Sequence, residues 1–119
     1  MTGIEYRRKA HDPSQLSELF LERFTNGDVE GLVQLYEADA VLALFGGGVA
    51  IGHAKIRAAY KDATSAPVSL RPGRQNLTVV QGDLALTSTT HDGGPITAEV
   101  ARRQPDGTWL WILDNPNLA

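Results

Sequence analysis

The sequence predicts an α+β domain in which helices cover one face of a strongly bent antiparallel sheet. Apolar residues in the first half of the chain recur at helical spacing, whereas after Pro67 they alternate in runs that are separated by tight turns. Helices followed by a run of strands are typical of the α+β class. The length of 119 residues fits one domain with one hydrophobic core.

Three helices are expected: over residues 14–25, after Asp28, and over residues 53–62. Asn26-Gly27 ends the first helix, and Asp28 is a favourable cap for the second because its carboxylate can accept from free N–H groups of the first turn. The apolar positions expected to face the core are Leu16, Leu19, Phe20 and Phe24, then Leu32, Val33, Leu35 and Tyr36, then Ile56, Ala59 and Tyr60.

A hairpin and four further strands make up the predicted sheet. Residues 40–45 and 49–51 form the hairpin around Gly46-Gly47-Gly48. The four later strands are expected to follow one another as a meander, because short turn sequences rich in glycine and aspartate separate them. Their ranges are residues 68–80 with a bend around Pro72-Gly73, residues 84–91, residues 96–104 and residues 108–114.

The last predicted strand carries a charged residue where an apolar one is expected. Strict alternation puts Trp109, Trp111 and Leu113 on one face of this strand and Leu110, Ile112 and Asp114 on the other. Both faces are apolar, so the strand is expected to be covered on both sides. A carboxylate at the end of such a stripe needs a partner, a wet cavity or a shifted pKa. The alternative is a strand-end Asp114 that turns to water or caps the Asn115-Pro116 turn.

Composition excludes several classes of protein. The net charge is −3 without a basic patch, so nucleic acid is not an expected partner. The absence of cysteine excludes disulfides and thiol catalysis. No apolar stretch is long enough for a signal core or a membrane span, which makes a cytoplasmic location the expectation and a membrane partner unexpected. The three histidines lack metal-site spacing, and no metal or cofactor is expected. Residues 1–13, with Arg7-Arg8-Lys9, are expected to form a solvated tail.

Several segments carry a family resemblance. They are Gly27-Asp28-Val29-Glu30-Gly31-Leu32, Asp39-Ala40-Val41, Gly52-His53-Ala54-Lys55-Ile56-Arg57-Ala58-Ala59-Tyr60 and Arg102-Arg103-Gln104-Pro105-Asp106-Gly107-Thr108-Trp109, with Asp114 after them. Over residues 14–116 the chain resembles the nuclear transport factor 2-like superfamily, specifically its SnoaL-like and ketosteroid isomerase-like small proteins. The resemblance implies a cystatin-like fold: a cone-shaped, curved, antiparallel or mixed sheet with three N-terminal helices on its concave face and a deep apolar pocket between them. Residues 14–119 then form a single SnoaL-like domain.

The resemblance also implies which residues form the site. Ketosteroid isomerase needs a carboxylate base and hydrogen-bond donors for the oxyanion. The base position matches Leu44 and the tyrosine donor position matches Phe20, neither of which can perform that chemistry, while a second acid falls near Glu99. Steroid-type isomerisation is therefore not expected. In the SnoaL-like cyclases an aspartate on a late strand acts as acid and base, and Asp114 corresponds to it.

Further polar residues are expected to converge on the same pocket. By comparison with the family, the strand face that carries Thr87, Thr89 and His91 lines it, and Arg74 pairs with Asp114 or Glu99 or orients an anionic substrate. Surface or packing roles remain the alternatives for these residues. The candidate catalytic residues are Asp114, Glu99 and His91, and the candidate substrate-binding residues are Phe20, Tyr36, Leu44, Tyr60, Arg74, Thr87, Thr89 and Ile112.

Two classes of function follow. One is an enzyme of the cyclase, isomerase or dehydratase type, in which Asp114 is the acid and base for a small apolar or carbonyl-containing molecule. The other is a non-catalytic ligand-binding or dimerisation module in which Asp114 is held by an arginine. In either class a homodimer is expected through the convex sheet face, where strict alternation places Trp109 and Trp111 beside Ala98 and Val100.

Overall fold

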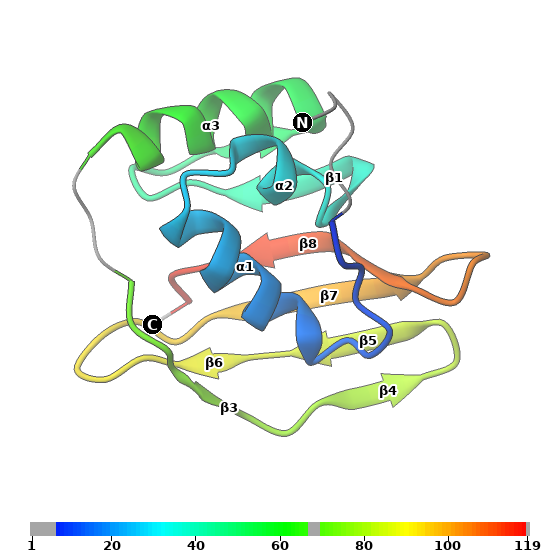
Figure 1. The fold of residues 1–119 in the computed structure, drawn as a ribbon. Helices are drawn as coiled ribbons and strands as arrows, with labels where there is room; N and C mark the ends of the chain where they lie inside the picture. The colour runs from blue at the N-terminus through cyan, green and yellow to red at the C-terminus, as the bar shows by residue number, and fades with distance from the viewer. Residues whose placement is uncertain (1–6, 67–69, 119) are drawn as a thin grey trace.

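The computed structural model describes residues 7–66 and 70–118, which form three helices and eight strands (Figure 1). The helices are α1 (Gln15–Thr25), α2 (Val29–Val33) and α3 (His53–Ser65). The strands are β1 (Tyr36–Ala43), β2 (Val49–Ile51), β3 (Arg74–Gln75), β4 (Val79–Gln81), β5 (Leu84–Thr87), β6 (Thr89–Thr90), β7 (Ala98–Arg103) and β8 (Trp109–Asn115). No helix in these two ranges is long and apolar enough to cross a membrane.

The sheet is mixed and follows the predicted meander in its second half. Its six strands lie in the order β2-β1-β8-β7-β5-β4, and a separate pair joins β3 to β6. Strands β4, β5, β7 and β8 pair antiparallel in sequence order, whereas β1 pairs parallel to β8 and closes the sheet against the hairpin strand β2. The α+β class with three helices and a large sheet is confirmed.

Several predicted boundaries change where strand pairing takes over. The second helix ends at Val33, and β1 begins at Tyr36 rather than at residue 40, because the Trp111 N–H donates to the Leu35 carbonyl at 2.8 Å and β1 continues along β8. The predicted strand 84–91 is interrupted at Ser88, which lies between β5 and β6. The predicted strand over residues 68–80 becomes β3 and β4, and residues 68–69 lie outside the described part of the chain.

The hydrophobic core lies between the helices and one face of the sheet, which we call the helix-covered face (Figure 1). Helix α3 packs on β1 and β2, and α1 packs on β8. The largest fully buried side chains are Leu16, Leu19, Leu32, Val33, Tyr36 and Ile56, which agree with the predicted inward positions of all three helices. Aromatic rings from α1, α3, β1 and β8 meet at the centre of this core.

The orientation predicted for the two tryptophans is wrong. Trp109 and Trp111 are 6% and 3% exposed, and both lie on the helix-covered face. Asp114 is also buried on this face, because a β-bulge adds Ile112 to β8 between the pairs Ala101–Trp111 and Val100–Leu113. A bulge resets the alternation of side chains, so residues on its two sides no longer follow one odd-and-even pattern. The patch expected around Trp109 and Trp111 on the convex face therefore does not exist.

The opposite face of the sheet, here called the open face, carries a different apolar row. Cross-strand partners in the register of all six strands place one aliphatic residue of each strand side by side. In sheet order this aliphatic row consists of Ile51, Val41, Leu113, Val100, Leu86 and Val79. Ile51, Leu113, Leu86 and Val79 are each at least half exposed, with fractions from 50% to 59%.

Residues 7–10, which the sequence places in a solvated tail, lie against the domain. Ala10 is buried, and its carbonyl accepts a hydrogen bond from the Trp109 N–H at 2.9 Å. Lys9 pairs with Asp106 on the surface at 3.2 Å. A single bridge of this kind leaves no periodic pattern in the sequence, so composition alone indicated a free tail.

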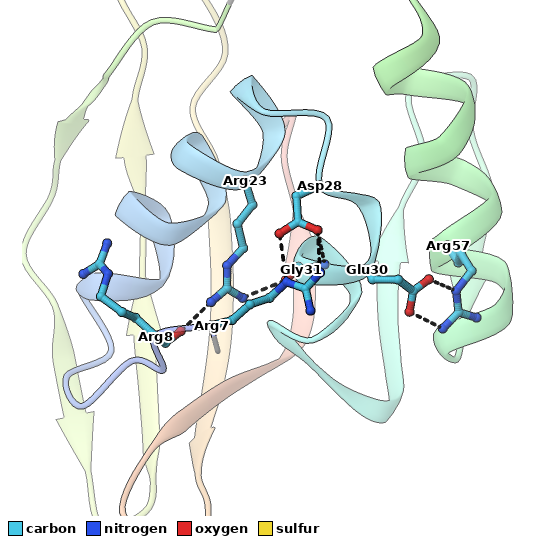
Figure 2. A network of polar contacts seen from close by, with 7 residues as sticks. All are labelled: Arg7, Arg8, Arg23, Asp28, Glu30, Gly31 and Arg57. Carbon is cyan, nitrogen blue, oxygen red and sulfur yellow. Dashed lines mark hydrogen bonds and ion pairs between the residues drawn. The ribbon is translucent and has the colours of Figure 1, made fainter. Parts of the chain in front are cut away.

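A polar network fixes this segment to α1 and α2 (Figure 2). Asp28 caps α2 as predicted by accepting from the Gly31 N–H at 3.1 Å, and its two oxygens also accept from Arg7 Nε and Nη2 at 2.9 Å each. The buried guanidinium of Arg23 donates to the Gly31 carbonyl at 2.7 Å and to the Arg8 carbonyl. Gly31 is required here, since a Cβ would lie 2.2 Å from Asp28 Oδ2.

We expect Asp28→Ala to lower the free energy of unfolding by about 1–2 kcal/mol, because it removes the helix cap and the partner of Arg7 together. Urea unfolding followed by circular dichroism measures the change. Glu22→Ala is the matched control, since it breaks only the exposed ion pair with Arg8 and is expected to cost less than about 0.5 kcal/mol. Equal effects of the two substitutions would contradict the role given to Asp28.

Candidate active site

Asp114 lies at the end of a buried chain of three hydroxyl and carboxyl groups. It is 7% exposed and projects from β8 onto the helix-covered face. The Tyr36 hydroxyl, at the start of β1, donates to Asp114 Oδ2 at 2.5 Å, and the Tyr60 hydroxyl from α3 lies 2.5 Å from the Tyr36 oxygen. No described residue forms a hydrogen bond with Asp114 Oδ1. Only one of the two carboxylate oxygens is thus engaged by a described residue.

Glu99 is the neighbour of Asp114 across the antiparallel pair of β7 and β8. The two residues are direct partners in the register, so their side chains leave the same face of the sheet. Glu99 is 7% exposed, and its Oε1 accepts from the Thr87 hydroxyl of β5 at 2.8 Å. Two carboxyl groups are thus buried side by side, which is costly when both are charged.

No cation in the described part of the chain forms an ion pair with either carboxyl group. Among residues 7–66 and 70–118, the ion pairs all involve other acids, namely Asp28, Glu22, Asp106, Glu30, Glu37 and Asp83. Burial and the negative field of Glu99 raise the pKa of Asp114 from 3.8 to about 7. The hydrogen bond from Tyr36 opposes this rise with a smaller effect. Burial also raises the pKa of Glu99, against hydrogen bonds from Thr97 and Thr87.

The two tyrosines stay protonated at every ordinary pH. Burial and the field of Asp114 raise the pKa of Tyr36 and Tyr60 well above 10. They are therefore hydrogen-bond donors and not bases. The hydrogen bond from Tyr36 holds the carboxyl group of Asp114 in one orientation. This carboxyl group gains or loses its proton near neutral pH.

Aromatic rings cover this carboxyl cluster on the side of the helices. The Tyr36 ring lies 5.3 Å from that of Trp111 and 6.1 Å from that of Tyr60, measured between centroids. Phe20 of α1 packs edge-on against Tyr60 at 5.8 Å and Trp111 at 6.1 Å. The predicted residues Phe20, Tyr36 and Tyr60 are thus brought together with Asp114 by three different elements.

The remaining predicted residues divide into two groups. Thr87 and Thr89 are buried on the helix-covered face, and the Thr89 N–H donates to the Thr97 hydroxyl at 3.0 Å. His91 follows β6, where its N–H donates to the Pro95 carbonyl at 3.1 Å, and it forms no hydrogen bond with either carboxyl group. Arg74 is exposed in β3 and forms no ion pair with Asp114 or Glu99.

Leu44 and Ile112 also lie away from the carboxyl cluster. Leu44 follows β1 and lines an open groove between the β1–β2 hairpin and α3, together with Val49, Ala50, Ile51, Lys55, Ala58, Ala59 and Asp62. Ile112 is the extra residue of the bulge and does not share a stripe with Asp114. The structure brings together the carboxyl groups, the tyrosines and the threonines, and leaves His91, Arg74, Leu44 and Ile112 outside their contacts.

Sequence reasoning missed two residues of this region. Thr97 bonds the Thr89 N–H beside the carboxyl cluster, although it precedes β7 and shows no pattern of its own. Trp111 was assigned to the other face because the bulge is invisible in the alternation. Within the described residues, no group of three or more histidine, aspartate and glutamate side chains is placed to hold a metal ion.

Comparison with known proteins agrees with this geometry. The sequence model of the SnoaL-like domain matches residues 17–115, which extend from the first turn of α1 to the end of β8. The chain belongs to the SnoaL-like domain family. This confirms the resemblance seen in the sequence, while no curated protein matches the chain.

Solved structures show the same fold for this SnoaL-like domain. A proposed dehydratase of the NTF2-like family from Streptomyces avermitilis is 24% identical, with a TM-score of 0.70 over 89% of this chain and 94% of that one. A ketosteroid isomerase-like protein from Erwinia carotovora atroseptica is 17% identical, with a TM-score of 0.69 over 86% and 89%. A protein of unknown function with a cystatin-like fold from Nostoc punctiforme is 18% identical, with a TM-score of 0.69 over 87% and 86%. At these identities the likeness establishes the cystatin-like, NTF2-like fold of the domain and not its activity.

Proposed function

We propose that this SnoaL-like domain is an acid/base enzyme of the cyclase, isomerase or dehydratase type, acting on a small apolar carbonyl compound from the cytoplasm. One observation carries the proposal: Asp114 is a buried carboxyl group that forms no ion pair with any described cation and that a tyrosine holds in place. A general base works best when its pKa lies near the working pH, which is the range that burial gives Asp114.

The reaction class follows from the protons that Asp114 can accept and return. Asp114 Oδ1 takes a proton from the carbon next to a carbonyl group, and the electron pair moves onto the carbonyl oxygen as an enolate. The same carboxylic acid then returns the proton to carbon or to a leaving hydroxyl, which gives isomerisation or dehydration, while attack of the enolate on a second carbonyl gives cyclisation. Tyr36 keeps Oδ2 engaged throughout, so that Oδ1 alone faces the substrate.

Glu99 assists through its charge in this proposal. Its proximity to Asp114 across β7 and β8 means that ionisation of one carboxyl group disfavours ionisation of the other. The negative charge of Glu99 therefore helps to keep the proton on Asp114 up to near-neutral pH. Thr87 fixes Oε1 of Glu99. His91, Arg74, Leu44 and Ile112 have no catalytic part in it, because none of them contacts the cluster.

Proton exchange tests the proposal without knowledge of the natural substrate. The purified protein is incubated in D2O with small cyclic ketones, among them 1-indanone, and deuterium at the α-carbon is followed by NMR. We expect exchange faster than in buffer with the same carboxylate content. No acceleration for any ketone, with ketone-dependent shifts in the protein spectrum, would instead support the alternative of a ligand-binding module.

We further propose that two copies of the chain associate through the open face. The sequence placed the dimer interface at Trp109 and Trp111, and the aliphatic row across the six strands takes their place in this proposal. Its exposed members form a continuous apolar strip that no described helix covers (Figure 1). Leu86 and Leu113 lie near its centre, one on each side of Val100.

We expect Leu113→Glu to convert a dimer into a monomer, because it places a charge at the centre of the buried strip. Size-exclusion chromatography with light scattering measures the change. Leu77→Glu is the matched control, since Leu77 is 86% exposed in the segment between β3 and β4, outside the row. A wild-type protein that is monomeric at micromolar concentration would reject this interface.

A further inference from the structure

One buried hydrogen-bond donor in the described part of the chain has no partner. The indole nitrogen of Trp111, Nε1, is enclosed and forms no hydrogen bond, whereas every other fully buried side-chain nitrogen or oxygen there has one. The backbone N–H of the same residue is satisfied by the Leu35 carbonyl at 2.8 Å. Leaving a buried donor unpaired is unfavourable, and such a group in a folded protein calls for a specific explanation.

The unpaired donor belongs to the same region as the carboxyl cluster. Trp111 and Asp114 both lie on β8, and the bulge at Ile112 shifts the alternation so that both side chains point to the helix-covered face. The Tyr36 ring lies against the Trp111 ring with 5.3 Å between centroids, and the Tyr36 hydroxyl is the donor to Asp114. Tyr36 therefore packs against the ring that carries the unpaired N–H and also bonds the proposed base.

The aromatic rings packed against Trp111 supply no acceptor for its indole nitrogen. The rings that contact Trp111 are those of Phe20 and Tyr36, and the Tyr36 hydroxyl is already joined to both Tyr60 and Asp114. The indole N–H is thus an unpaired donor among aromatic rings, which is complementary to one acceptor oxygen on an apolar molecule.

We propose that the Trp111 indole N–H donates a hydrogen bond to the carbonyl oxygen of the ligand. The inference rests on the proposed function and narrows its substrate to compact apolar molecules with one acceptor oxygen near the reacting carbon. Phe20 is half-buried and lies edge-on to Trp111, so its ring is the one that a ligand displaces to reach Nε1. Negative charge that develops on the carbonyl oxygen then meets an oriented donor in a dry environment.

Indole N–H signals give a direct test, because the chain contains two tryptophans and its nitrogen-15 spectrum holds two such signals. Trp109→Phe assigns the remaining signal to Trp111. The probes are 1-indanone and indane, which share a carbon skeleton and differ in the acceptor oxygen. We expect 1-indanone to move the Trp111 indole proton downfield and leave that of Trp109 in place, and indane to move neither downfield.

A variant measures the contribution of the N–H to binding. Trp111→Phe keeps an aromatic ring and is expected to weaken 1-indanone binding by about threefold to tenfold, which is the contribution of one neutral hydrogen bond. The affinity for indane is expected to be nearly the same in the variant and in the wild-type protein. The wild-type spectrum decides the question if this variant does not fold.

Two results would overturn the inference and differ in what else they reject. Shifts of the backbone amides around Asp114 with 1-indanone, while the Trp111 indole signal stays in place, would exclude the donor and leave the acid/base proposal standing. The absence of any 1-indanone-dependent shift, together with the absence of α-proton exchange, would reject the donor and the acid/base site together.

Discussion

Replacing Asp114 by asparagine is expected to slow α-proton exchange by at least about a hundredfold, which is the lower end of what a positioned general base contributes. Asparagine has nearly the same shape and can still accept the hydrogen bond from Tyr36, so the variant removes the base and keeps the surrounding contacts. Asp39→Asn is the matched control, because Asp39 is exposed on β1 and is expected to leave the rate unchanged.

The same assay has a predicted dependence on pH. Asp114 accepts a proton only when it is ionised, and its pKa is about 7. The exchange rate of the wild-type protein, corrected for buffer, is therefore expected to rise between about pH 5 and 7 and to level off above, while the residual rate of Asp114→Asn lacks this inflection. A rate already level at pH 5 would mean that the base is an ordinary exposed carboxylate and not Asp114.

Asp114→Asn is also expected to stabilise the fold at alkaline pH. The pKa of Asp114 is about 7 in the folded protein against 3.8 as its ordinary value, so the folded state holds this proton more tightly than the unfolded chain. The free energy of unfolding of the wild-type protein accordingly decreases as pH rises from about 4 to 7 and stays lower above that range. At pH 8 the variant, which has no charge to bury, is expected to be more stable by on the order of 2–4 kcal/mol.

The difference between the two proteins isolates this effect. Near pH 4 both carry a neutral group at this position, and their free energies of unfolding are expected to be similar. Acids with lowered pKa values, such as Asp28 beside Arg7, lose their stabilising contribution as pH falls, but they do so in both proteins and cancel in the difference. Denaturant unfolding at pH 4, 6 and 8 measures the difference in free energy of unfolding between the two proteins. If the wild-type protein were more stable than the variant at pH 8, the charge of Asp114 would be stabilised in the fold, which would contradict this account.

The sequence was sufficient for the fold because its signals are local and repeated. The spacing of Leu16 and Leu19 and the cap at Asp28 indicated α1 and α2, and glycine-rich turns separated the strands of the meander. The start of β1 at Tyr36 could not be found in this way. Its pairing with Trp111 joins segments far apart in the chain, and that long-range contact overrides an apolar spacing that favours continued helix.

The candidate site was predictable only in part, for a reason that lies in β8. Asp114 and Glu99 were identified, and the structure buries them as direct partners. The route to Asp114 assumed strict alternation, which placed it opposite Trp111, whereas one extra residue at Ile112 puts both on the same face. A bulge depends on how two strands meet and leaves little trace in one sequence. Arg74 was a reasonable partner by charge, but its exposed position in β3 depends on tertiary structure.

The pKa of the Asp114 side chain, measured by carbon-detected NMR over a pH titration, tests the central claim most directly. A buried carboxyl group beside Glu99, with no ion pair to a cation of the described residues, is predicted to titrate near 7, and Asp114→Asn identifies the signal. A value at or below 3.8, the ordinary value for aspartate, would mean that Asp114 is exposed or paired with a cation, and would contradict the acid/base site.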